Sequence, residues 1–300
     1  MITPEGMRDT LFNDCSLQRK IENDFCKIAE KKSYKEIATP MFEFYDVFDH
    51  KTLNFPQESL YKFTDNKGRL MVLRPDVSLP IARSAATRLR NEKLPLRLFY
   101  IQDVFRVNHS DTGKSSSIRQ IGAELIGQVS DLELFSLVID FLSTFNFKFT
   151  IEIGHIGIFK DLTKKLKSEE KFDEIDLIRD LISRKNSPSL DTMKIDNSLK
   201  LLPKMFGKDD VFQKAENIYN EKYLDELKNL YNSLSEKTDV IIDLGLVNKI
   251  NYYTGVVFKG YIGGTEVLSG GRYDKLLGKF GYDVPAMGFA LNLDAMLGVL

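Results

Sequence analysis

Apolar residues recur at helical spacing close to the N-terminus, at Leu17, Ile21, Phe25, Ile28 and Ala29. This period predicts a first helix with one apolar face. Residues 34–44 follow as a strand-like segment containing Pro40, which is typical of an edge strand or a bulge. Residues 61–73 predict two short strands joined by a turn at Asp65-Asn66-Lys67-Gly68.

Further apolar runs predict strands at residues 96–107, 118–127, 149–153, 239–244, 252–261 and 266–268. Helices are predicted over residues 78–89 and 130–142, the second opened by a capping box at Ser130-x-x-Glu133. The last segment, residues 288–300, has the pattern of a strand end that runs into a helix. This order of hairpins and helices favours an α+β fold with a mainly antiparallel sheet.

Residues 158–237 differ in character from the segments on either side. Two runs within them keep a helical period: Phe172, Ile175, Ile178, Leu181 and Ile182, and then Leu224, Leu227, Leu230, Tyr231 and Leu234. Charged residues fill the other positions, which indicates amphipathic helices. We therefore expect a core domain made of residues 1–157 and 238–300, interrupted by a helical insertion of residues 158–237.

Composition narrows the class of protein. Hydrophobic residues make up 43% of the 300 residues, and 42 Lys and Arg against 43 Asp and Glu leave a net charge of −1. This balance lacks the basic excess typical of nucleic-acid-binding domains. The histidines and the two cysteines, Cys15 and Cys26, have no metal-ligand spacing, so we expect no metal site and reduced thiols. With no signal peptide and no apolar run of membrane-spanning length, a cytoplasmic protein is expected.

The sharpest motif is the run Asn251-Tyr252-Tyr253-Thr254-Gly255-Val256-Val257-Phe258, followed by Gly270-Gly271-Arg272-Tyr273-Asp274. Adjacent residues of a strand point to opposite faces, so we expect one of Tyr252 and Tyr253 to enter a pocket while the other packs. Tyrosine offers a flat apolar ring and a hydroxyl, which suit an imidazole edge. The alternative is core packing with the hydroxyls hydrogen-bonded.

Polar residues elsewhere supply further candidates for ligand binding. The period of a strand places Gln120, Gly122 and Glu124 on one face, where a buried glutamate needs a partner or a cationic ligand. Asp76 precedes the helix predicted from residue 78, so its carboxylate either binds a ligand or caps that helix. Arg106, in Phe105-Arg106-Val107-Asn108, offers a planar fork for phosphate or carboxylate, the alternative being a surface arginine at a strand end.

These motifs, together with Gly288-Phe289-Ala290-Leu291-Asn292-Leu293-Asp294-Ala295, resemble the catalytic core of class II histidyl-tRNA synthetases over nearly the whole chain. The resemblance implies the fold of that class, an antiparallel sheet flanked by helices. It also implies a pocket for the ammonium and imidazole of histidine, made of Asp76, Ser78, Gln120, Glu124, Tyr252 and Tyr253. Asp76 stands where these synthetases carry the longer glutamate.

Charged groups are missing at three separate motifs of this pattern. Asn108 stands in place of a glutamate, and Asn248 and Ala295 each stand in place of an arginine. Asn251 and Asn292 replace an aspartate and a glycine. Activation of an amino acid requires charges arranged in advance around ATP and the carboxylate. The resemblance therefore implies a site that binds a ligand but does not form an adenylate.

A synthetase-like scaffold without catalysis resembles the regulatory subunits of ATP phosphoribosyltransferase, in a form that lacks the C-terminal anticodon-binding domain. The resemblance implies a homodimer that joins the short catalytic subunit in a hetero-octamer. That assembly carries out the first step of histidine biosynthesis under histidine feedback. Mg²⁺ and the substrates, ATP and phosphoribosyl pyrophosphate, belong to the catalytic partner, so no cofactor is expected in this chain. Neither tRNA nor a membrane is an expected partner.

We hypothesise that the pocket still recognises histidine or a related effector. Because the arginine is lost at Asn248, the ligand carboxylate needs another donor, for which Arg106 and Arg272 are the candidates. The alternative is feedback that acts on the partner or at the subunit interface and leaves the pocket vestigial. Two other classes stay open: an active histidyl-tRNA synthetase with unusual motifs, and a stand-alone histidine-binding scaffold.

Overall fold

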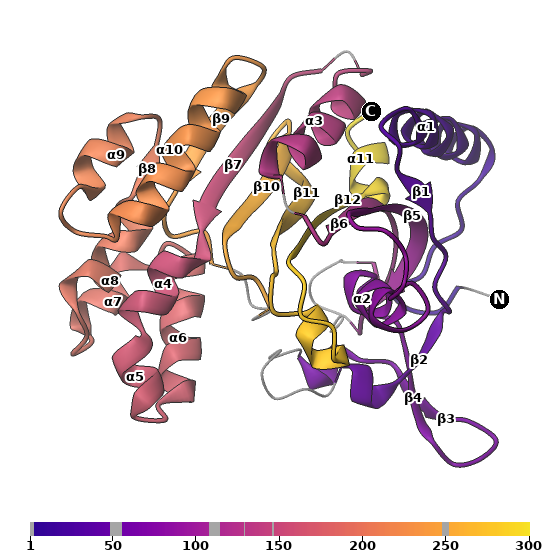
Figure 1. Cartoon of the computed structure of the whole chain (residues 1–300), viewed down its shortest axis with the longest axis horizontal. Helices are drawn as coiled ribbons and strands as arrows, with labels where there is room; N and C mark the ends of the chain where they lie inside the picture. The colour runs from indigo at the N-terminus through magenta and orange to yellow at the C-terminus, as the bar shows by residue number, and fades with distance from the viewer. Residues whose placement is uncertain (1–2, 49–55, 108–114, 129, 146, 248–251) are drawn as a thin grey trace.

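A computed structural model describes residues 3–48, 56–107, 115–128, 130–145, 147–247 and 252–300 (Figure 1). Its centre is a nine-stranded sheet with the strand order β1-β5-β6-β12-β11-β10-β7-β9-β8. In this sheet β1 runs parallel to β5 and β7 parallel to β9, and the other neighbouring strands are antiparallel. The expected α+β fold with a mainly antiparallel sheet is confirmed.

The strands of the large sheet are β1 (Lys35–Glu36), β5 (Leu96–Phe105), β6 (Ser117–Ile126), β7 (Phe149–His155), β8 (Phe206–Gly207), β9 (Asp239–Asp243), β10 (Val256–Ile262), β11 (Thr265–Arg272) and β12 (Ala286–Asn292). A second, three-stranded sheet consists of β2 (Phe42–Phe44), β4 (Leu70–Leu73) and β3 (Lys62–Thr64) in that spatial order. The helices outside the insertion are α1 (Phe12–Lys31), α2 (Ser78–Thr87), α3 (Asp131–Leu142) and α11 (Leu293–Leu297).

Part of the hydrophobic core lies between the large sheet and the helices α1, α3 and α11 (Figure 1). At its centre, the ring of Phe25 on α1 meets Phe99, Phe141 and Phe289 edge-on, at centroid separations of 6.0, 5.1 and 6.2 Å. Side chains of a strand alternate between its faces, so the neighbours of Phe99 and Phe289 point to the opposite face of the sheet. Helix α2 begins on that second face, where Ser78 reaches Glu124 of β6. The fold thus leaves the α2 side of the sheet for a pocket.

The prediction of one strand over residues 34–44 is wrong. The structure has β1 in the large sheet and β2 in the small one, separated by a segment around Pro40. Proline has no N–H to donate to a sheet. Next to it, the amide of Thr39 donates to Gln102 Oε1 (3.3 Å), and Arg74 donates to the Thr39 carbonyl (2.7 Å). Side chains therefore satisfy this backbone in place of a neighbouring strand.

Two smaller expectations are also corrected. Helix α3 begins where predicted, but the Ser130 side chain makes no capping bond. The Glu133 carboxylate pairs instead with Arg97 of β5 at 2.6 Å, because an arginine fork competes well for a carboxylate. Strand β10 begins at Val256, so Tyr252 and Tyr253 precede the strand predicted to contain them.

The segment between β7 and β9 is largely helical and lies at the end of the sheet away from α1 (Figure 1). Its helices are α4 (Ile156–Leu162), α5 (Lys164–Ser168), α6 (Phe172–Ser183), α7 (Ser187–Thr192), α8 (Asn197–Leu201), α9 (Asp210–Ala215) and α10 (Glu221–Ser235). The two-residue strand β8 also belongs to this segment and extends the sheet beyond β9. A strand this short has no recognisable pattern in the sequence. The boundaries of an insertion subdomain at residues 158 and 237 stay a prediction.

The described residues give two further negative findings. Within these ranges, no helix combines the length and the apolar character that a bilayer crossing requires. The same residues hold no group of three His, Cys, Asp or Glu side chains that could bind a metal ion. Both cysteines are free thiols, with Cys15 exposed and Cys26 half-buried.

Candidate ligand-binding site

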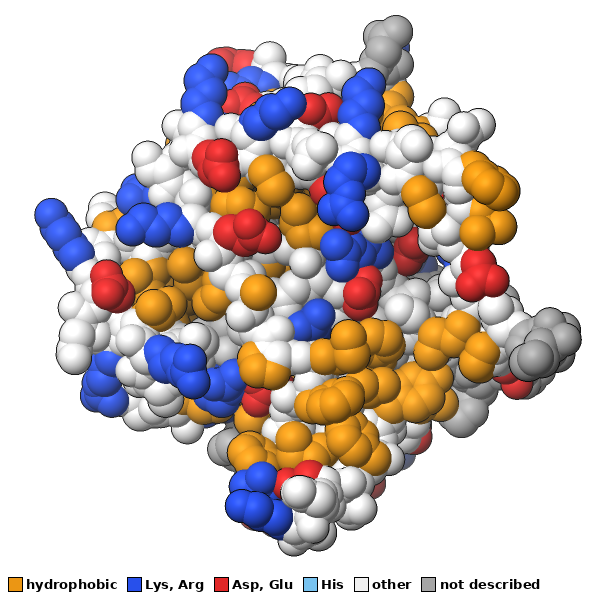
Figure 2. All heavy atoms as spheres, turned by 90° about the vertical axis from the view of Figure 1, so that its right-hand side faces the viewer, with side chains coloured by type: hydrophobic (Ala, Val, Ile, Leu, Met, Phe, Trp, Pro, Cys, Tyr) orange, Lys and Arg blue, Asp and Glu red, His pale blue; other side chains and the backbone are white. Residues whose placement is uncertain are grey.

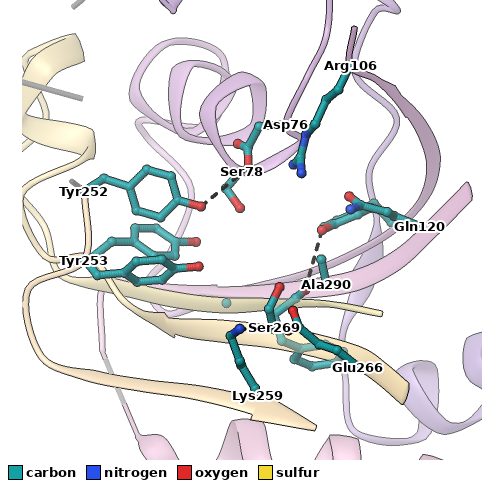
Figure 3. A pocket seen from close by; sticks show the side chains of 14 residues that line it. Asp76, Ser78, Arg106, Gln120, Tyr252, Tyr253, Lys259, Glu266, Ser269 and Ala290 are labelled. Atoms are coloured by element: carbon teal, nitrogen blue, oxygen red, sulfur yellow. Dashed lines mark hydrogen bonds and ion pairs between the residues drawn. The ribbon is translucent and has the colours of Figure 1, made fainter. Parts of the chain in front are cut away.

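A cavity of about 240 Å³ opens on the α2 side of the large sheet (Figure 3). Six of the predicted binding residues line it: Asp76, Ser78, Arg106, Gln120, Tyr252 and Tyr253. Glu124 lies beneath them, fully buried, and touches the cavity wall through Ser78 and Tyr273. Segments far apart in the sequence thus converge on one concave site, which is the usual form of a small-molecule pocket.

Strand register builds the floor of this pocket in two rows, because residues directly opposite on neighbouring strands share a face. The first row runs through Glu152, Lys259, Ser269, Ala290, Gly122 and Tyr100. The second row runs through Val257, Gly271, Gly288 and Glu124. Gln120 and Glu124 flank Gly122 on β6, so the predicted common face of these three residues is confirmed.

Glycines of the second row make room for the polar groups above them. A Cβ atom at Gly288 would lie 1.7 Å from Glu124 Oε2, and one at Gly271 would lie 2.8 Å from the ring of Tyr253. Both distances are shorter than van der Waals contact, so any larger residue displaces the carboxylate or the ring. The motif glycines are therefore needed for the shape of the pocket.

Glu124 is held by hydroxyl groups. Ser78 Oγ donates to Glu124 Oε1 at 2.5 Å, and the Tyr273 hydroxyl donates to Oε2. Burial raises the pKa of the Glu124 carboxyl well above its usual range, and the nearby Asp76 carboxylate raises this pKa further. A buried carboxyl without a cation favours its neutral form. The predicted need for a partner is met by these two hydroxyls.

Asp76 combines both of the roles proposed for it from the sequence. Its Oδ1 atom accepts a hydrogen bond from the Leu79 amide at 2.9 Å in the first turn of α2. Its Oδ2 atom faces the cavity, 3.5 Å from the Tyr252 hydroxyl. Burial raises the pKa of the Asp76 carboxyl, while the charge of Arg106 opposes this rise. Capping α2 therefore fixes the carboxylate at the pocket wall.

The tyrosine pair differs from its prediction. Tyr252 and Tyr253 both line the cavity, with ring centroids 4.6 Å apart, instead of pointing to opposite faces. They stand before β10, where the alternation of a strand does not apply. The Tyr253 carbonyl accepts a hydrogen bond from Lys160 of α4, whose pKa is lowered by burial to about 8. The inserted helices therefore contact the backbone of the tyrosine motif directly.

The two arginines proposed to receive a ligand carboxylate lie in different places. Arg106 donates through Nε to the Pro75 carbonyl at 2.8 Å and extends toward the cavity in Figure 3. Arg272 does not line the cavity, and its Nε donates to both Asp274 oxygens at 2.9 Å. It follows Gly271, which faces the pocket, so alternation along β11 turns Arg272 to the other side. The structure supports Arg106 as a pocket residue and removes Arg272 from the pocket.

Lys259, Glu266 and Ser269 also line the cavity and were not predicted from the sequence. Lys259 Nζ pairs with Glu266 Oε2 at 2.7 Å. The residues are separated by the β10–β11 turn, and only the pairing of those strands brings them together. The one available signal is that Lys259 lies two positions after Val257 on a strand otherwise rich in apolar residues.

Of the three positions that lack a catalytic charge, Ala295 is described by the structure and lies on α11. Asn292 caps this helix, since its Oδ1 accepts from the Ala295 amide at 3.0 Å. Asp294 pairs with Arg8 at 2.7 Å and accepts from the Arg119 amide at 2.9 Å. Asn108 and Asn248, together with Asn251, lie outside the described residues. Helix α11 is thus held by the Asn292 cap and by the interactions of Asp294 with Arg8 and with the Arg119 amide.

Comparisons with known proteins identify the family of this chain. A family model described as histidyl-tRNA synthetase matches residues 6–296. The ATP phosphoribosyltransferase regulatory subunits of Clostridium acetobutylicum and Acetivibrio thermocellus are 38% and 37% identical to this chain, over 99% of it and 78% and 76% of their own length.

Solved structures give the same result for the fold. A crystal structure from Bacillus halodurans, described as an ATP phosphoribosyltransferase regulatory subunit/histidyl-tRNA synthetase, is 31% identical. It superposes with a TM-score of 0.87 over all of this chain and 83% of that one. The apo histidyl-tRNA synthetase of S. aureus is 23% identical, with a TM-score of 0.69 over all of this chain and 73% of its own, and shows the likeness of fold alone.

Proposed function

This chain belongs to the histidyl-tRNA synthetase family and, within it, to the ATP phosphoribosyltransferase regulatory subunits, and from this premise we propose that it is a non-catalytic regulatory subunit of that transferase. Its place is then the first step of histidine biosynthesis, where it is needed for the activity of a short catalytic subunit. The observation that carries the proposal is a contrast within one scaffold. The amino-acid pocket keeps its polar residues, while Ala295 occupies the position where the synthetase pattern has an arginine.

The proposed partner supplies what this chain lacks. The short catalytic subunit brings ATP, phosphoribosyl pyrophosphate and Mg²⁺, so this chain carries no cofactor of its own. The proposed assembly is a hetero-octamer. The proposal includes no tRNA, in keeping with a balanced charge that lacks the basic excess typical of nucleic-acid-binding domains. Free thiols suit the reducing cytoplasm, the compartment proposed for this assembly.

A homodimer within this assembly is supported by an exposed apolar surface. Met41, Phe42, Phe44 and Leu70, on or beside the three-stranded sheet, expose between 42% and 52% of their surface. Figure 2 shows apolar side chains gathered in the lower half of the face where β2, β3 and β4 lie. A contiguous apolar patch of this kind is typical of a protein–protein interface.

The proposed effector of the pocket is histidine. Asp76 and Glu124 offer carboxyl groups for its ammonium, and the hydroxyls of Tyr252 and Tyr253 offer partners for its imidazole. Arg106 also lines the cavity, where its charge stabilises the Asp76 carboxylate. In a complex with the catalytic subunit, Tyr252→Phe should weaken feedback inhibition by histidine, and unchanged feedback would contradict a role for the pocket.

The proposed function is tested by phosphoribosyl-ATP formation. The short catalytic subunit from the same organism is assayed alone, with this chain, and with this chain plus histidine. We expect strong activation by this chain and reversal of the activation by histidine. Absence of activation by folded chain, together with no complex on a sizing column, would overturn the proposal.

A further inference from the structure

Lys259 lies across the cavity from Asp76 (Figure 3). Its position in the first row of the floor turns its side chain toward the cavity, beside Ser269 of the neighbouring strand. Directly opposite residues of an antiparallel pair lie close enough for their side chains to act together. The ammonium of Lys259 and the hydroxyl of Ser269 thus form a polar pair at the end of the pocket away from Asp76.

The groups around Lys259 leave its charge available to a ligand. Its ion-pair partner Glu266 has 45% of its side chain exposed, against 28% for Lys259. On the other side of Lys259 in the same row, Glu152 accepts a hydrogen bond from the Tyr261 hydroxyl at 2.9 Å. Because an exposed ion pair contributes little to stability, Glu266 can exchange for another anion at small cost.

Charged side chains lie at both ends of the cavity. Asp76 lies at one end beside Arg106, whose charge favours the ionised Asp76 carboxyl, while Glu124, buried beneath this end, favours its neutral form. Lys259 supplies a positive charge at the opposite end, where its partner Glu266 also lines the cavity and keeps 45% of its side chain exposed. A ligand whose cationic group meets Asp76 therefore places its anionic group toward Lys259.

We propose that Lys259, together with Ser269, receives the carboxylate of the amino-acid effector, replacing the arginine lost at Asn248. Glu266 holds the Lys259 ammonium while the pocket is empty and releases it to the ligand. Ligand carboxylate and lysine then form a charge-assisted hydrogen bond that is better shielded from water than the Lys259–Glu266 pair. This assignment rests on the proposed function, because it takes the pocket as an amino-acid site.

Calorimetric titration of the full chain with histidine and with histidinol, which carries an alcohol in place of the carboxylate, tests the assignment. The variants are Lys259→Met, Glu266→Gln and Arg106→Met, with Lys228→Met on the exposed surface of α10 as the matched control. We expect Lys259→Met to weaken histidine binding by about 10- to 100-fold, which is the range for the loss of a charged hydrogen bond. The same variant should bind histidinol with an affinity within about threefold of that of the unaltered chain. Glu266→Gln should strengthen histidine binding and leave histidinol unchanged, and Lys228→Met should change neither.

Three outcomes would overturn the assignment. If Lys259→Met weakened the binding of histidine and of histidinol equally, the lysine would not contact the carboxylate. A carboxylate-selective loss in Arg106→Met alone would transfer the role to Arg106. Failure of the unaltered chain to bind either ligand would overturn the histidine pocket itself, and the carboxylate site with it. If Lys259→Met unfolds, Lys259→Arg decides the point, since a retained positive charge should keep the preference for histidine over histidinol.

Discussion

Two regions of the molecule compare differently with the synthetase pattern: the pocket keeps its polar residues, and α11 lacks the arginine. In the pocket, Glu124 is buried among hydroxyls above Gly288, and the tyrosine pair faces the same cavity. At α11, which follows β12 directly, the arginine position holds Ala295. There the neighbouring Asp294 is bound to Arg8.

Under the proposed function, binding and catalysis depend on separable parts of one scaffold. A pocket needs a particular shape. That shape depends on the glycines of the floor and on the strand register, which many residues of the sheet determine together. Chemistry on ATP needs a few charges at fixed points, and each can be lost without disturbing the sheet. The proposed regulatory role depends on that separation, because a retained pocket can bind an amino acid without activating it.

The largest effect is expected where the pocket is most buried. Glu124→Ala removes the acceptor of the Ser78 and Tyr273 hydroxyls and leaves both without their partner. We expect loss of histidine binding and a decrease of about 3 kcal/mol in the free energy of unfolding. Calorimetry and chemical denaturation measure the two effects. Normal histidine affinity in this variant would remove Glu124 from the site.

A smaller effect is expected when the carboxyl is displaced but kept. In Gly288→Ala the new Cβ atom would meet Glu124 Oε2, so the carboxyl or β12 must shift. We expect about 2 kcal/mol of destabilisation and weakened histidine binding. Gly278→Ala is the control, since its Cβ atom would meet only Asp283 Oδ1, at 3.4 Å. Equal stability of the two variants would mean that the floor tolerates a methyl group.

The buried carboxyl also predicts a dependence of stability on pH. Burial raises the folded-state pKa of Glu124 above its unfolded value of about 4.3, so the folded chain keeps a proton that the unfolded chain releases. Stability is then fullest below about pH 4.3 and falls as pH rises toward the folded pKa, by at most about 1.4 kcal/mol per pH unit for this group.

Glu124→Gln isolates that contribution, because the amide resembles the neutral acid and does not titrate. Denaturation curves from pH 5 to pH 8 should show a shallower fall of stability in the variant. The comparison is needed because burial also raises the pKa of Asp76 and of Asp131, and those residues titrate in both proteins. Parallel pH profiles would mean that Glu124 is ionised in the folded chain.

The smallest effect is expected at α11. Ala295→Arg restores the residue type of the synthetase pattern at a half-buried position of a short helix. Because Asn108 and Asn248 still lack their charges, we expect no amino-acid activation and a change in stability within about 0.5 kcal/mol. Recovery of activation by this one substitution would show that the loss of catalysis rests on a single group.

Sequence patterns predicted the α+β fold and most strands, because apolar period is a local signal. The pocket was predicted through the resemblance, and the structure places Asp76, Ser78, Arg106 and Gln120 at its wall. Arg272 was assigned to the pocket wrongly because its facing depends on the register of β11. Lys259 was missed for the same reason, since only the β10–β11 pairing brings it beside Ser269. The register between strands that are far apart in the sequence cannot be predicted from a single sequence.

Histidine-dependent exchange of pyrophosphate into ATP tests most directly whether this scaffold keeps its pocket without the chemistry. The assay is made on chain that binds histidine by calorimetry, with an authentic histidyl-tRNA synthetase as the positive control. We expect no exchange above the protein-free baseline. Exchange that requires histidine and is lost in Tyr252→Phe would contradict this expectation, and would identify the chain as an active synthetase.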